Sequence, residues 1–77
     1  MPFTPADKFS PAENRVRAAP EYFVATVFRG RRTYDRREVA TLEEACAAAA
    51  TLYEGDRGVM IYAVAGGYQA MLGSWRP

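Results

Sequence analysis

The clearest hydrophobic pattern in the chain lies in residues 41–55, TLEEACAAAATLYEG. Thr41 and Glu44 have the spacing of a capping box at a helix N-terminus, and Gly55 is of the type that ends a helix. Apolar residues recur between them at intervals of three and four, as on one face of an α-helix. They are Leu42, Ala45, Cys46, Ala49, Leu52 and Tyr53. The pattern predicts an amphipathic helix on whose stripe the rest of the chain packs.

Two segments before this helix have the apolar and β-branched residues of strands. Residues 21–29 (EYFVATVFR) form one predicted strand, and residues 32–39 (RTYDRREV) form its antiparallel partner across a glycine turn. A two-residue loop would pair Phe28 with Thr33, whereas one more loop residue would pair Phe28 with Tyr34. The pattern leaves this register open. Both faces of the first strand carry large apolar groups, so we expect it to be central in the sheet or covered on its second face.

A second hairpin is predicted after the helix, with strands at residues 59–65 (VMIYAVA) and 68–75 around the turn signal Gly66-Gly67. A two-residue loop would give the pairs Ala65 with Tyr68, Ala63 with Ala70, and Ile61 with Leu72. These small and aliphatic side chains would face the helix. The opposite face would then carry the larger side chains of Met60, Tyr62, Met71 and Trp75.

The order of these elements, ββαββ, predicts an α+β fold with one helix packed on a four-stranded antiparallel sheet. A single helix cannot cover both faces of such a sheet, so we expect one face to stay uncovered. Residues 21–77 would form this single domain.

Residues 1–20 hold four of the five prolines and are predicted to form a proline-rich N-terminal arm. Ser10 and Glu13 have capping-box spacing, and Pro11 suits the first helical position, so a short helix over residues 11–18 is expected. The arm is either a flexible leader or a packed part of the domain. In the second case its apolar side chains could cover the uncovered sheet face; these are Phe3, Phe9 and Val16.

Composition limits the class of protein. Of the 77 residues, 49% are hydrophobic and 25% are charged, which is typical of a small globular domain with marginal stability that a homodimer interface would increase. The net charge of +1 speaks against a DNA mimic and against a wholly basic nucleic-acid coat. The chain shows neither a signal-peptide pattern nor an apolar run of membrane-spanning length, so we expect a cytoplasmic protein without membrane contact.

The reactive residues are few. The chain has no histidine and one cysteine, which removes the usual general base, the commonest metal ligand and thiolate metal clusters. Cys46 falls on the packing stripe of the predicted helix, where a cysteine usually acts as a small buried hydrophobe. We therefore expect no catalytic site, no metal and no cofactor, and a protein that is not an enzyme.

The first hairpin carries five arginines in nine residues. They are Arg29, Arg31, Arg32, Arg36 and Arg37. Arginine's planar fork suits phosphate and carboxylate, so this hairpin could bind a nucleic-acid backbone or an acidic protein surface. The alternative is a solvated hairpin in an arginine-biased sequence. The stretch GRRTYDRREVATLEEA is similar in pattern to the arm-type DNA-binding domains of phage integrases, which end with their helix whereas this chain continues.

The uncovered sheet face is the second candidate surface, because aromatic residues, methionine and arginine are enriched at protein interfaces. In its small size, near-neutral charge, and arginine and aromatic surfaces, the whole chain resembles the small inhibitors that bacteriophages direct against host machinery, such as anti-CRISPR proteins. The resemblance is one of build, without a shared motif. It implies a protein that docks on a nucleic-acid-handling protein complex and blocks it sterically. The candidate partner-binding residues are Arg29, Arg31, Arg32, Arg36, Arg37, Tyr62, Met71 and Trp75.

The alternative function is a nucleic-acid-binding module that places the arginine-rich hairpin directly on phosphate. Stacking of single-stranded bases on Tyr62 and Trp75 is a third use of the same residues.

Overall fold

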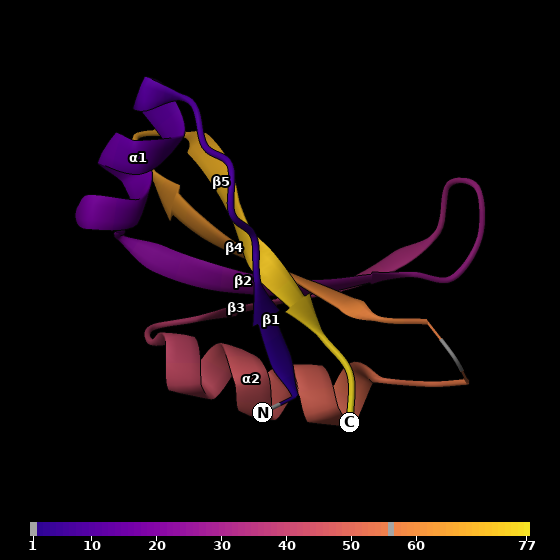
Figure 1. The fold of residues 1–77 in the computed structure, drawn as a ribbon. Coiled ribbons are helices and arrows are strands. Elements are labelled where there is room, and N and C mark those ends of the chain that lie inside the picture. The colour runs from indigo at the N-terminus through magenta and orange to yellow at the C-terminus, as the bar shows by residue number, and fades with distance from the viewer. Residues whose placement is uncertain (1, 56) are drawn as a thin grey trace.

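The computed structural model describes residues 2–55 and 57–77, and the protein is α+β, as predicted (Figure 1). The elements are β1 (Phe3–Pro5), α1 (Pro11–Ala18), β2 (Tyr22–Phe28), β3 (Tyr34–Val39), α2 (Leu42–Leu52), β4 (Val59–Ala65) and β5 (Tyr68–Trp75). The strands form one antiparallel sheet of five, in the order β1-β5-β4-β2-β3. The predicted ββαββ order with four strands and one helix is therefore incomplete, because the N-terminal arm adds a strand and a helix.

The N-terminal arm packs on the domain. Ser10 caps α1 as predicted: its hydroxyl accepts the backbone N–H of Glu13 at 3.2 Å, and the Glu13 carboxylate accepts the N–H of Ser10 at 2.9 Å. Before this helix, β1 runs along β5, with Phe3 opposite Trp75. Of the two alternatives for the arm, the structure shows the packed one.

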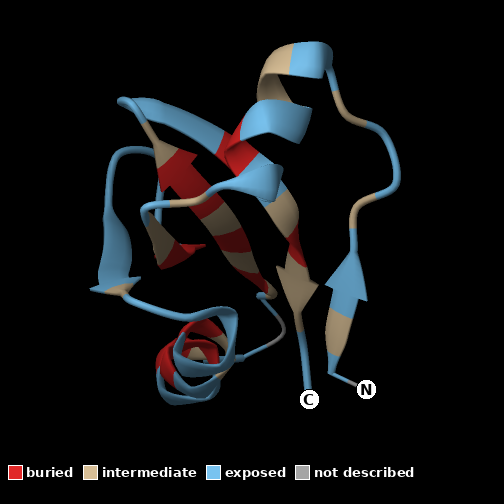
Figure 2. Ribbon diagram, turned by 90° about the vertical axis from the view of Figure 1, so that its left-hand side faces the viewer, coloured by how far each residue is buried: buried red, intermediate tan, exposed pale blue. Residues whose placement is uncertain are grey.

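Both helices lie on the same face of the sheet. The main cluster of buried residues joins α2 to β2 and β4 and contains Ala25, Val27, Ala45, Ala48, Ala49, Leu52, Val59 and Ile61. A smaller cluster sets Val16 of α1 against Ala63 and Ala70, and both clusters contact Phe23 and Leu72. Figure 2 shows the buried residues gathered in the central strands and in α2. The helices thereby remove the apolar side chains of these two clusters from water.

The arm does not cover the opposite face, in contrast to the possibility considered above. Phe3 packs on the α2 cluster and Val16 on the α1 cluster, so both belong to the helix-covered face. Phe9, which precedes α1, instead contacts a side chain of that helix: the guanidinium carbon of Arg17 lies 3.6 Å from the centre of the ring.

The α2 helix starts as predicted and ends earlier than predicted. The Thr41 hydroxyl accepts the N–H of Glu44 at 3.1 Å, but the helix ends at Leu52 and not near Gly55. Tyr53 leaves the helical conformation with φ −61° and ψ 130°, and its ring packs edge-on against Trp75 with centroids 5.9 Å apart. Gly55, with φ 65°, lies in the turn beyond the helix.

The first hairpin has the longer of the two loops considered. Phe28 pairs with Tyr34, which leaves residues 29–33 as the loop. As expected, β2 is central, because it pairs with β3 on one side and with β4 on the other.

The second hairpin differs from the predicted register at one residue. Ala65 pairs with Tyr68 as predicted, but Ile61 pairs with Gly73 and not with Leu72. The pairing shifts between Ile61 and Tyr62, so Leu72 is an additional residue in β5. One inserted residue exchanges the faces of all residues that follow it.

The consequence is that Trp75 does not lie on the uncovered face, where it was predicted. It sits opposite Val59 on the helix-covered face and packs against the α2 cluster. Gly73 beside the bulge lies close to β1, and a side chain there would collide with the carbonyl oxygen of Thr4 and with the ring of Phe3. The bulge and this glycine thus let β1 join the sheet.

We expect Trp75→Ala to lower the free energy of unfolding by about 2–4 kcal/mol, because it removes a large, partly buried ring that packs against the core. Met71→Ala, directly before the bulge and on the uncovered face, should stay within about 0.5 kcal/mol of the wild type, because Met71 is exposed. Urea unfolding followed by circular dichroism measures both variants. Tryptophan fluorescence is unsuitable, because Trp75→Ala removes the only tryptophan of the chain. Equal losses for the two variants would contradict the bulged register.

Candidate functional site

The sheet face opposite both helices carries a group of large side chains, and we call this surface the open face. Its residues alternate with the helix-facing ones along four strands. They are Tyr22, Val24, Thr26 and Phe28 of β2, Tyr34, Arg36 and Glu38 of β3, Met60, Tyr62 and Val64 of β4, and Gln69 and Met71 of β5. Val24 and Thr26 in the middle are buried, at 0% and 7% exposure, so their larger neighbours shield them.

The larger side chains of the open face remain in contact with solvent. Phe28 and Tyr34 are each 54% exposed and Met71 is 38% exposed. Phe28 and Tyr34 face each other across the β2–β3 pair with ring centroids 6.1 Å apart. Exposed aromatic rings gathered on one surface of a small domain are typical of a binding site.

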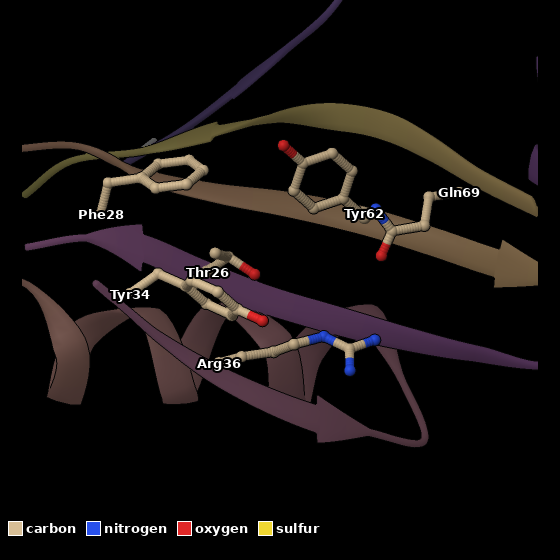
Figure 3. A pocket seen from close by; sticks show the side chains of 6 residues that line it. All are labelled: Thr26, Phe28, Tyr34, Arg36, Tyr62 and Gln69. Atoms are coloured by element: carbon tan, nitrogen blue, oxygen red, sulfur yellow. The ribbon is translucent and has the colours of Figure 1, made fainter. Parts of the chain in front are cut away.

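A pocket of about 390 Å³ lies in this surface. The six residues that line it are Thr26, Phe28, Tyr34, Arg36, Tyr62 and Gln69. Figure 3 shows Thr26 between two rows of side chains: Phe28 and Tyr62 on one side, and Tyr34 and Arg36 on the other. Gln69 stands at one end. The pocket therefore has three aromatic walls and a polar floor and end.

The charge on the open face comes from Arg36 and Glu38. The Nη1 atom of Arg36 lies 3.1 Å from a carboxylate oxygen of Glu38, and the two side chains are 37% and 54% exposed. Such a pair contributes little to stability, and a ligand can compete for the arginine. The lining of the pocket contains no carboxylate, thiol or imidazole, and so provides no pair of a nucleophile and a general base.

Arg29 is held inside the domain. Its Nε atom lies 2.8 Å from Asp35, its Nη1 atom lies 3.0 Å from Glu54, and its Nη2 atom donates to the carbonyl oxygen of Leu52 at 2.8 Å. The last contact satisfies a free carbonyl at the end of α2. Arg57 adds a second link, because it donates to the carbonyl oxygen of Phe28 at 2.8 Å. These two arginines thus connect the β2–β3 hairpin to the C-terminal end of α2 and to the loop that follows it.

The other arginines of the predicted cluster do not share one surface. Arg31 and Arg32 lie in the exposed loop at the tip of the hairpin, which projects from the domain (Figure 1). Arg36 belongs to the open face, whereas Arg37 pairs with Ala25 and so lies on the opposite side of the sheet. The structure therefore brings Arg36 together with the aromatic residues and separates it from the rest.

Among the predicted aromatic and methionine residues, Tyr62 and Met71 lie on the open face together with Met60, and Trp75 does not. Sequence reasoning did not assign Phe28, Tyr34, Thr26 and Gln69 to a site. For two of them the sequence did offer an indication, because the longer-loop register of the first hairpin places Phe28 opposite Tyr34.

Other candidate chemistry is sparse. Cys46 on α2 is partly buried, and this burial raises the pKa of its thiol, which disfavours the reactive thiolate. In residues 2–55 and 57–77, no cluster of three or more cysteine or acidic side chains is arranged to hold a metal ion. Within the same ranges, none of the helices has the length and apolar character needed to cross a membrane.

Comparison of the chain with known protein families, with curated proteins and with solved structures finds no significant match.

We expect Arg29→Ala to lower the free energy of unfolding by about 1–3 kcal/mol, because it removes charge-assisted hydrogen bonds, one of them to a helix carbonyl. Arg31→Ala is the matched control in the same hairpin and should change stability by less than about 0.5 kcal/mol. Urea unfolding followed by Trp75 fluorescence measures both variants. Equal stabilities for the two variants would refute the structural role of Arg29.

Proposed function

We propose that the protein acts by binding and not by catalysis, as a small inhibitor that docks on a nucleic-acid-handling protein complex and blocks it sterically, in the manner of anti-CRISPR proteins. The observation that supports this proposal is the open face itself. Phe28, Tyr34 and Met71 are exposed there, on a surface that neither described helix covers. Burial of these side chains by a partner would provide the apolar centre of an interface.

The distribution of charge suits a protein partner. The open face carries one arginine and one glutamate, which is close to neutral, and a surface of this kind tolerates an apolar partner. Arg31 and Arg32 stand beyond one end of the face, at the tip of the hairpin, where they could pair with acidic residues at the rim of an interface. Rim charges of this type mainly raise the association rate and the specificity.

Direct binding of the hairpin to phosphate is the second candidate function. The exposure of Arg31 and Arg32 favours it. Because Arg29 is engaged within the domain and Arg37 lies on the other side of the sheet, only a few arginines could contact one backbone. We therefore expect any such binding to have a shallow salt dependence, of about two to three phosphate contacts.

The proposal is tested by adding the purified protein to a panel of RNA-guided effector complexes and measuring the binding of target DNA. We expect the wild-type protein to inhibit at least one of them. Met71→Glu should weaken this inhibition by at least about tenfold, because it buries a charge at an apolar interface. Ala47→Glu places the same charge on the exposed side of α2 and should inhibit like the wild type. A panel without any inhibition, or equal loss in both variants, would refute the proposal.

A further inference from the structure

The pocket in the open face combines features that a flat apolar interface does not need. It is recessed, it is walled by Phe28, Tyr34 and Tyr62, and it has polar groups at its floor and end. We infer that this pocket binds an unpaired base of single-stranded nucleic acid, with the neighbouring phosphate at Arg36. The inference does not depend on the proposed function, because the pocket would take a base from a free oligonucleotide as well.

The walls and the volume fit a base. A volume of about 390 Å³ is large enough for one nucleobase with its sugar. Aromatic side chains bind unpaired bases by stacking, largely regardless of sequence, because every base has a π-face. The rings of Phe28 and Tyr34 belong to adjacent strands at one end, and Tyr62 stands across from Tyr34 (Figure 3). A base that enters between them contacts rings from three strands.

The polar groups fit the edges of a base. Thr26 is the only buried polar residue in the described part of the chain, at 7% exposure, and its hydroxyl oxygen points into the pocket (Figure 3). Gln69 supplies an amide that can both donate and accept at the end of the pocket. Base edges carry donors and acceptors side by side, so this pair of side chains suits them. An acyl chain would offer neither group a hydrogen-bond partner.

Arg36 is the cationic group that could bind an anionic part of a ligand in this pocket. Three aromatic walls alone would also suit an alkylammonium group, but Arg36 lines the same pocket and repels a cation. The ion pair of Arg36 with Glu38 uses the Nη1 atom, and the guanidinium has further N–H donors for a phosphate oxygen. Arg31 and Arg32 lie beyond Phe28 at the tip of the hairpin. They would extend the positive charge along a bound single strand of nucleic acid. Stacking requires exposed base faces, so single strands and not duplexes are expected.

The test is a fluorescence-anisotropy titration of the full chain with 5′-labelled dT8 and rU8, and with a labelled duplex of the same length, at 50 and 150 mM NaCl. We expect dissociation constants for the single strands of about 10–100 µM, and binding of the duplex at least about tenfold weaker. Absence of binding to both single strands up to 1 mM protein at 50 mM NaCl would overturn the inference.

Four variants separate the pocket from general electrostatics. Tyr62→Ala and Arg36→Ala should each weaken single-strand binding by at least about fivefold. Tyr68→Ala removes an exposed tyrosine whose position pairs with Ala65 on the helix-covered face, and Arg37→Ala removes the neighbouring arginine of β3. Both controls should bind within about twofold of the wild type. Equal effects of the two arginine variants would overturn the inference in favour of nonspecific attraction.

Phe28→Ala provides a second test of the pocket should Tyr62→Ala fold poorly, because Phe28 is exposed and its removal leaves the core intact. It should also weaken binding by at least about fivefold.

An acidic, tryptophan-containing peptide represents the competing class of ligand, a protein side chain. If this peptide binds in the same range and the oligonucleotides do not, the pocket takes a protein side chain and the inference is wrong. Inhibition of an effector without oligonucleotide binding would refute this inference alone.

Discussion

The structure depends on helices that cover one face of the sheet only. The two described helices have 8 and 11 residues, and both pack on the same side, so the opposite side must remain stable without a second layer. The alanine-rich stripe of α2 permits close contact with β2 and β4 and gives a thin but dense core. On the open face, Val24 and Thr26 are shielded by larger side chains, which themselves stay partly in water. The surface available for binding follows from this one-sided packing.

A single additional residue in β5 decides what each face contains. Without the bulge at Leu72, Trp75 would point to the open face; with it, Trp75 closes the core beside Tyr53 and Val59. The same segment contains Gly73, whose missing side chain makes room for β1. Core packing, attachment of the N-terminal strand and the composition of the open face are therefore coupled through two adjacent residues.

Local signals in the sequence predicted much of the fold. The cap at Ser10, the start of α2 at Thr41 and the Gly66-Gly67 turn depend on residues close in sequence, and the structure confirms them. The short strand β1, the bulge and the contacts of Arg29 with Asp35 and Glu54 depend on residues that meet only after folding. Alternation placed Tyr62 and Met71 correctly on the sheet face opposite the helices. It left the pairing of Phe28 with Tyr34 open, because the length of the loop sets that register.

Hydroxyl-radical footprinting of the dilute protein tests most directly whether one sheet face is uncovered in solution. Methionine and tryptophan side chains both react readily with the radical, so the sulfur of Met71 and the indole of Trp75 report on the two faces of the same strand. We expect fast oxidation of Met71 and of Tyr34 and slow oxidation of Trp75, in accordance with 38% and 54% exposure for the first two and with packing of the third against the core. Protection of Met71 and Tyr34 to the same degree as Trp75 would show that this face is covered, and would contradict its role as the binding surface.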